Sequence, residues 1–492
     1  MHEARQRLAP LLRNFLVLGA GNYGAMAVSL GINAVLTRRL GVEQFGHLAL
    51  LVTASQVFAL LGVNWTHTAL VRFGAQEFAA SGSVASAFWT RIWIVLPWLA
   101  MAVAVILAGG QYVAGYLMIP RVGLFVVLGQ FAASFVLLTA GGVFQARNAM
   151  RNYGLVLFLD KAVMGLLLLA LLGSSWTGSP LAIVSMYAAS STVVAGWALT
   201  RVGLGSLLPM TFNRQAVRAM LAFSLPLLLS SWVGLFGTNW VDIFIIKKYR
   251  PLSEVGFYSL GTVLAGVVQQ VTIIFSTLLL PQLSVMVGNG EHEKIRVFVE
   301  RFLPYWFLAT TVLFAVVVLV ADPLVPLIFG RAFSPAASVL AMLMVAACAL
   351  ALFNAFSPLM SAFGATWALT GFCLASGVVN VAMDLMLIPA YGVKGAALAT
   401  VVAYATSAAL VLVYVQRRLE QNVFRLGLLA LPVVVVCGCF LTLGTVRFYL
   451  LAIPAGILIV FWLMHRFQLF RGEDAMFIGS LSALSSRTRR IS

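Results

Sequence analysis

Charged residues are scarce in this chain, and acids are scarcer than bases. Only 9% of the 492 residues are charged, whereas 62% are hydrophobic, and the chain holds 14 Asp and Glu against 31 Lys and Arg. Soluble domains carry about 25% charged residues. The composition therefore excludes a row of soluble domains and predicts repeated membrane spans. The basic start "MHEARQRLAPLLRN" leads into an apolar run too long for a signal-peptide core, so we expect an uncleaved cytoplasmic end.

Cysteine and histidine are too few and too scattered to predict a metal or a cofactor. The cysteines lie within apolar runs without a histidine cluster nearby, so we expect free thiols. They are Cys348, Cys373, Cys437 and Cys439. The basic residues fall singly or in pairs between apolar runs rather than on one face, which indicates loop charge and excludes a nucleic-acid partner.

One stretch fits a dinucleotide-binding fingerprint, "GAGNYG" at Gly19–Gly24. That fingerprint requires a preceding strand and a soluble βαβ unit. Here the glycines lie inside an apolar span, so the pattern favours close packing of two helices instead.

Fourteen apolar runs are long enough to cross a membrane as helices. The chain is therefore predicted to be an all-α polytopic membrane protein with about 14 transmembrane helices. The predicted spans are 15–36, 46–70, 92–110, 122–144, 155–173, 181–200, 220–244, 256–280, 303–321, 336–358, 366–388, 395–415, 426–445 and 448–465.

The distribution of Lys and Arg orients these spans. With the N-terminus inside, the cytoplasmic segments hold 21 basic residues and the opposite loops hold 9. Short loops rich in Lys and Arg stay in the cytoplasm, so we expect both termini to be cytoplasmic. The clusters "RR" and "KKYR" are exceptions on the outer side.

A polar stripe in the first span recurs in the seventh. Both stripes have spacings of 0, 7 and 11, which puts their members near one line of a helix. The stripes are Asn22, Ser29 and Asn33, and, 209 residues later, Ser231, Thr238 and Asp242. Both spans start inside, so the copies have parallel topology. We expect the stripes to face water between two halves, with bonding to their own or a neighbouring helix as the alternative.

Few other polar residues lie at membrane depth. Each is either functional or part of a bond between helices. Asp160 and Lys161 are adjacent, so they point in different directions and need not pair. The others are Gln56, Asn64 and His67 in span 2, Arg72 at its end, Gln269 and Gln270 in span 8, and Asn380 and Asp384 in span 11.

Several segments resemble the polysaccharide-export flippases of the multidrug/oligosaccharidyl-lipid/polysaccharide exporter superfamily. Their order and spacing along nearly the whole chain carry the resemblance. The segments are Leu225–Gly261, "LLLPQLSVM" (Leu278–Met286), "LIFGRAFSPAASVL" (Leu327–Leu340), "IPAYGVKGAALATVVAYA" (Ile388–Ala405) and "LVRF" (Leu70–Phe73).

The resemblance implies two six-helix lobes around a central cavity and two additional C-terminal helices. The expected divisions are 1–219, 220–424, 425–465 and a basic tail at 466–492. It also implies transport of a lipid-linked oligosaccharide across the inner membrane, with membrane lipids and other polysaccharide-assembly proteins as partners.

A polyprenyl-diphosphate sugar needs cations for its head, amides and aromatics for its glycan, and an apolar groove for its tail. The resemblance implies that spans 13 and 14, which are nearly free of polar residues, flank the tail. The candidate cations are Arg72, Arg91 and Lys161. The candidate glycan contacts are Asn22, Asn33, Gln56, Asn64, Trp65, Asn239, Gln269 and Gln270, with His67 and Asp242 in the same predicted cavity. Coupling-ion candidates are Asp160, Asp242 and Asp384.

Two other transporters remain open alternatives. A multidrug or organic-cation antiporter of the same superfamily needs a deep carboxylate, for which Asp160 is the candidate in the first half, beside Lys161. A peptidoglycan lipid-precursor flippase differs in its sugar rather than its fold. A membrane glycan polymerase or ligase needs a sizeable outer loop with catalytic groups, and the short outer segments carry none, so the chain is not expected to be an enzyme.

Overall fold

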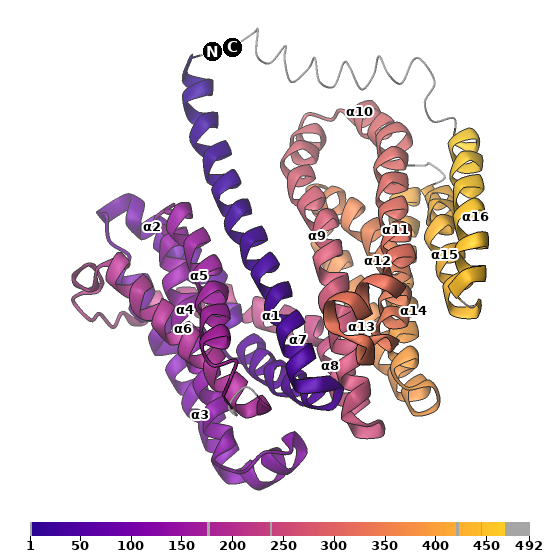
Figure 1. Ribbon diagram of the computed structural model, residues 1–492. Coiled ribbons are helices and arrows are strands. Elements are labelled where there is room, and N and C mark those ends of the chain that lie inside the picture. Colours follow the sequence, from indigo (N-terminus) through magenta and orange to yellow (C-terminus); the bar gives the residue numbers. More distant parts are fainter. Residues whose placement is uncertain (1, 175–177, 237–238, 420–422, 444, 468–492) are drawn as a thin grey trace. The chain divides into compact units, whose positions relative to one another are not determined.

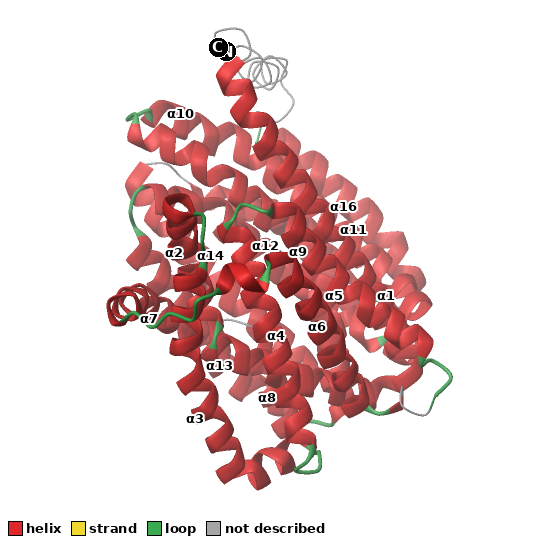
Figure 2. Ribbon diagram, turned by 90° about the vertical axis from the view of Figure 1, so that its left-hand side faces the viewer, coloured by secondary structure: helices red, strands yellow, loops and turns green. Residues whose placement is uncertain are grey.

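The computed structural model describes residues 2–174, 178–236, 239–419, 423–443 and 445–467. Within these ranges every regular element is a helix, joined by short loops (Figure 2). The chain divides into two compact units, Arg5–Leu235 and the described residues from Phe236 onwards.

Seven α-helices belong to the first unit. They are α1 (His2–Gly62), α2 (His67–Ser81), α3 (Ala85–Leu117), α4 (Gly123–Ala146), α5 (Met150–Ala170), α6 (Pro180–Val202) and α7 (Arg214–Phe236). Within this unit α4 packs on α2 and α6. Its glycine- and alanine-rich end, around Ala140–Phe144, is fully buried.

The first two predicted spans are joined in one helical run with a kink. Inside α1, Gly41 adopts φ 72° and ψ 178°, a backbone conformation open to glycine but strained for other residues. The second span then breaks at a short 3₁₀ turn, Asn64–Thr66, and α2 leaves at 43° to the preceding helix. Breaks of this kind free backbone groups inside a span.

The second unit is built around α12. Its helices are α8 (Asn239–Tyr249), α9 (Leu252–Gly288), α10 (His292–Val297), α11 (Leu303–Phe329), α12 (Pro335–Ala362), α13 (Thr366–Tyr391), α14 (Val393–Leu419), α15 (Leu431–Thr442) and α16 (Thr445–Arg466). Helix α12 packs on α9, α11 and α14, and its many alanines allow that close approach. Helices α15 and α16 lie side by side against α11 (Figure 1).

The charged stretch after α8 holds a turn of the second unit together. Arg250 donates through Nε and Nη2 to the carbonyl oxygens of Ile388 and Pro389, at 3.2 and 2.8 Å. Glu254 accepts the backbone N–H of Val393 at 2.6 Å. Arg250 and Glu254, both in the charged segment "KKYRPLSE", thus bind backbone groups of the turn between α13 and α14. This explains why these two charged residues occur in an apolar chain.

The described residues do not reach the predicted count of fourteen spans. Ten helices in the described ranges are long and apolar enough to cross a membrane, or eleven when the bent pair at Asn64 counts as one span. Spans 15–36 and 46–70 both fall on that bent pair, while the side chains of 102 and 105–107 in span 92–110 and residues 237–238 in span 220–244 lie outside the described residues.

The glycine-rich stretch at Gly19–Gly24 packs two helices closely. A Cβ atom at Gly21 would lie 2.6 Å from the carbonyl oxygen of Gly154 in α5, whereas one at Gly19 would meet open space. This confirms the prediction of close helix packing for Gly21, but not for Gly19.

We therefore expect Gly21→Ala to lower the thermal unfolding midpoint of the purified protein and Gly19→Ala to leave it unchanged. The added methyl group at Gly21 meets rigid backbone, a clash that typically costs about 1–3 kcal/mol. Two variants with equal midpoints would contradict the close approach of α1 and α5.

Candidate functional site

The second unit encloses two carboxylates beside one another. Asp242 on α8 and Asp384 on α13 are fully buried. Nδ2 of Asn380 lies 2.7 Å from Oδ1 of Asp242 and 3.2 Å from Oδ2 of Asp384. The hydroxyl of Tyr258 on α9 donates to Asp242, and the hydroxyl of Thr400 on α14 lies 3.5 Å from the same carboxylate oxygen. Four helices meet at these five residues, which we call the carboxylate cluster.

No ion pair in the described chain neutralises this cluster. The acids that form ion pairs among the described residues are Asp160, Glu291 and Glu300, and none of them belongs to the cluster. In addition, Oδ1 of Asp384 is buried without a hydrogen-bond partner among the described residues. Two enclosed carboxylates this close cannot both stay charged without compensation. Because carboxylate, amide and hydroxyl oxygens suit hard cations, the cluster can hold a shared proton or a hard cation such as sodium.

The second polar stripe does not face open water at Asp242, contrary to the prediction from the sequence. The prediction is wrong for Asp242, because α9, α13 and α14 enclose its carboxylate completely. Asn33 and Ser231 donate to carbonyl oxygens of their own helices, at Ser29 and Leu227. These bonds match the alternative in which polar groups satisfy the local backbone. The side chain of Thr238 lies outside the described residues.

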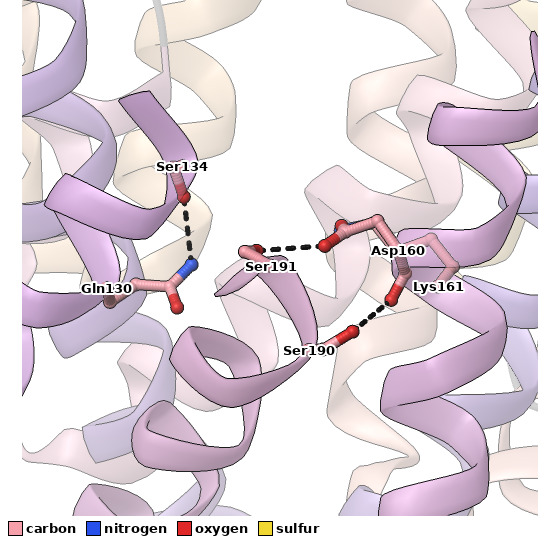
Figure 3. Close-up of polar contacts among 6 residues, drawn as sticks. All are labelled: Gln130, Ser134, Asp160, Lys161, Ser190 and Ser191. Atoms are coloured by element: carbon pink, nitrogen blue, oxygen red, sulfur yellow. Dashed lines mark hydrogen bonds and ion pairs between the residues drawn. The ribbon is translucent and has the colours of Figure 1, made fainter. Parts of the chain in front are cut away.

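The first unit contains a charge pair held by two serines (Figure 3). Lys161 Nζ lies 2.7 Å from Oδ2 of Asp160, so the expectation that these neighbours need not pair is wrong. Ser191 on α6 donates to Oδ1 of Asp160 at 2.8 Å, and Ser190 donates to its backbone oxygen at 2.6 Å. These bonds between α5 and α6 fix the carboxylate on one side, and Lys161 is about one third exposed.

Gln130 and Ser134 on α4 share a hydrogen bond of 3.2 Å in the same region of Figure 3. The Oε1 atom of Gln130 is buried without a partner among the described residues. Helices α4, α5 and α6 therefore all bring polar side chains to this part of the first unit.

The other two candidate cations differ sharply in exposure. The exposed guanidinium of Arg72 lies over the rings of Phe73 and Phe223, at 5.6 and 4.6 Å from their centroids. Arg91 on α3 is fully buried and donates through Nε to Oγ1 of Thr66 at 3.0 Å. Its Nη1 and Nη2 atoms have no hydrogen-bond partner among the described residues.

The remaining predicted contacts are spread over both units. Trp65 is buried and donates to the carbonyl of Gly62, while His67 lies 3.3 Å from the amide of Gln145. Among the predicted glycan contacts, Asn22 and Gln56 are exposed. Asn64, Gln269 and Gln270 are half-buried, and the side chain of Asn239 lies outside the described residues.

The residues that complete these clusters were missed by sequence reasoning. Tyr258 and Thr400 come from other helices, 16 and 158 positions from Asp242. Ser190 and Ser191 lie about thirty positions from Asp160, in a run of small residues with no charge to mark it. No pattern in the sequence pairs such distant positions.

The many apolar helices define a polytopic helical membrane protein, and both units enclose charged side chains. Comparison with known proteins gives the family. The model of the polysaccharide biosynthesis protein family matches residues 11–287, and that of the lipid II flippase MurJ matches residues 198–466. The chain belongs to the polysaccharide and lipid-linked oligosaccharide flippases of the multidrug/oligosaccharidyl-lipid/polysaccharide exporter superfamily.

One curated relative is a probable low-salt glycan biosynthesis flippase, Agl15 of Haloferax volcanii. It is 24% identical over 234 residues, and the match spans about half of each protein, 46% of this chain and 48% of the relative.

Solved structures show the same fold. The lipid II flippase MurJ in an inward closed conformation has a TM-score of 0.72 at 12% identity, covering 93% of this chain and all of that one. The Vibrio cholerae transporter VcmN in its bent form has a TM-score of 0.52 at 15% identity, covering 84% and 99%. An inward-facing multidrug resistance transporter of the same superfamily has a TM-score of 0.56 at 13% identity, covering 83% and 95%.

The carboxylate cluster makes one testable prediction. The unfolding midpoint of the wild type is expected to rise as sodium replaces choline at constant ionic strength, because a bound cation stabilises the state that binds it. Asp242→Asn removes one of the two charges and should abolish this rise. Asp322→Asn, in α11 and outside the cluster, is the control and should keep it. An equal sodium response in both variants would rule out a cation at Asp242.

Proposed function

We propose that this protein is an inner-membrane flippase that moves a polyprenyl-diphosphate-linked oligosaccharide from the cytoplasmic to the outer face, for surface polysaccharide export. The match of the polysaccharide biosynthesis family over residues 11–287 carries the proposal. The glycan biosynthesis flippase of Haloferax volcanii supports it with a partial match. Such a protein moves its lipid-linked substrate across the membrane without changing it chemically, so it needs no catalytic residues. Deleting it should cause the lipid-linked glycan to accumulate on the cytoplasmic face.

The mechanism we propose is alternating access by two lobes. The parallel repeat supports lobes of six spans each, at 1–219 and 220–424, which open a shared cavity first inwards and then outwards. Residues 425–465 supply spans 13 and 14, and the proposed cytoplasmic basic tail at 466–492 lies outside the described residues from position 468 onwards.

The proposal assigns residues of the chain to the diphosphate, the glycan and the lipid tail of the substrate. The diphosphate is assigned to Arg72, Arg91 and Lys161, because a doubly anionic head needs cations inside a membrane. The polar and aromatic residues named for the glycan keep that role in the proposal.

The lipid tail is assigned to the apolar side of α15 and α16. A groove of about 270 Å³ lies between these helices and α11 in the second unit. Its lining side chains are apolar, among them Val316, Leu319, Val436, Ile457 and Phe461. A polyprenyl chain in the bilayer can pack along such a surface through van der Waals contacts.

A coupling cation is assigned to the carboxylate cluster. Asp242 and Asp384 are enclosed together without a basic partner among the described ion pairs. Asp160 is the weaker candidate, because Lys161 already compensates it.

One alternative substrate has its own support. The match of the MurJ family over residues 198–466 favours a peptidoglycan lipid precursor. The identity of the accumulating lipid in a deletion strain separates the two glycans. The multidrug transporters share only the fold, at 13–15% identity, which leaves an organic-cation antiporter as the weaker alternative.

The proposed topology predicts where reporters will be active. Both termini and the loop at 285–302 are expected in the cytoplasm, because the basic residues favour that side. Fusions of a cytoplasm-active and an outside-active reporter at these points provide the measurement. An outside-active fusion within "GEHEKIRVFVER" would contradict the fourteen-span arrangement.

The assignment of the head group predicts that Arg72→Lys and Lys161→Gln insert normally but export less glycan. Lysine keeps the charge of Arg72 but loses the planar fork that binds phosphate through two bonds. The change of Lys161 to glutamine removes the positive charge itself.

The matched control is Arg201→Lys. Arg201 is also exposed and lies over an aromatic ring, that of Trp197 at 5.7 Å from its centroid, but it is outside the proposed site. Export should fall roughly tenfold for the two site variants and remain normal for the control. Full export by both site variants would remove Arg72 and Lys161 from the substrate site.

A further inference from the structure

Arg91 is a fully enclosed cation that lacks a counter-charge. Its guanidinium is bound only at Nε, by Oγ1 of Thr66, while Nη1 and Nη2 have no partner among the described residues. Two acids of the first unit have known partners, and neither partner is Arg91. Glu77 accepts the backbone N–H groups at the start of α3, and Asp160 binds Lys161.

Such an arrangement is costly unless a ligand completes it. A buried charge is stable only when it is paired and hydrogen-bonded. The two Nη atoms of an arginine form a planar fork that matches two oxygens of one phosphate. The open end of Arg91 therefore has the geometry of an oxyanion-binding group.

The start of α2 also lies beside Arg91. Thr66 is the residue before α2, and its hydroxyl donates to Val63 at 2.8 Å instead of capping the helix. The backbone N–H of His67, the first residue of α2, donates to the carbonyl oxygen of Asn64. Nδ1 of His67 is buried without a partner among the described residues.

A single aromatic ring covers this position. The guanidinium of Arg91 lies over the ring of Phe135 on α4, 5.2 Å from its centroid. The face of an aromatic ring is electron-rich and is a weak substitute for a counter-anion. Phe135 itself is half-buried and also packs against the buried cluster of Val63, Val95 and Phe131.

We propose that Arg91, together with the start of α2 at Thr66 and His67, forms a closed oxyanion site, and that Phe135 is its cover. The anion is of the phosphate class and enters when the ring turns away. That the anion is the diphosphate of the lipid-linked substrate rests on the proposed function. Arg91 then differs from the exposed Arg72 and the ion-paired Lys161, because it is fully buried and two of its nitrogens have no hydrogen-bond partner among the described residues.

The test uses the full chain in lipid nanodiscs and inorganic pyrophosphate as the probe. Pyrophosphate should raise the unfolding midpoint of the wild type above that in sodium chloride of equal ionic strength. Arg91→Met should lose this rise. Phe135→Ala should reach it at roughly tenfold lower pyrophosphate, since the cover no longer competes for the guanidinium. Arg201→Met, which removes an exposed arginine, is the control and should respond as the wild type does.

Each opposite result overturns the site. An equal response of Arg91→Met and wild type would show that pyrophosphate acts elsewhere, and an equal response in chloride would replace the oxyanion by a halide. Should Arg91→Met fail to fold, Phe135→Ala decides alone, and an unchanged pyrophosphate dependence in it refutes the cover and the site.

A second measurement identifies the source of the anion. Flipping of the lipid-linked glycan by Arg91→Met in proteoliposomes should fall at least roughly tenfold relative to Arg201→Met. Normal flipping combined with lost pyrophosphate binding would assign the site to free phosphate and overturn its role in substrate binding. Because pyrophosphate binding is measured without transport, its failure leaves the flippase proposal itself intact.

Discussion

The cost of enclosing charge among apolar helices governs this structure. Where water is absent, an ionised side chain must meet an opposite charge, a set of hydrogen bonds or a ligand. The chain solves this problem in three ways. Arg250 and Glu254 bind backbone groups of a turn, Asp160 binds Lys161 and Ser191, and Asp242 shares its bonds with Tyr258 and Asn380.

The charges left uncompensated have opposite signs in the two units. In the first unit the open group is a cation, Arg91, and in the second it is a pair of acids, Asp242 and Asp384. In the proposal, Arg91 binds the anionic substrate and the two acids bind a cation, in keeping with the sign of each charge.

Sequence reasoning succeeded where the signal is local. Apolar runs of about 20 residues predict helices, and helices are what the described residues contain. The glycines at Gly19–Gly24 were interpreted through the helix around them, and the contact of Gly21 with Gly154 confirms that interpretation. It failed for Asp242, whose water-facing position was inferred from one helix alone. Its enclosure depends on three other helices, and helical periodicity carries no information about them.

The amino-acid sequence by itself determined that this chain is helical, lies in a membrane and belongs among the flippases, because hydropathy, helix length and the order of family segments are properties of consecutive residues. Only the tertiary structure decided which polar groups are satisfied. Lys161 could be paired with its neighbour or left for substrate, and Arg91 could lie at a surface or in a core. The packing of α2, α3 and α4 enclosed Arg91 with two open nitrogens, since burial is the product of contacts between residues far apart in the chain.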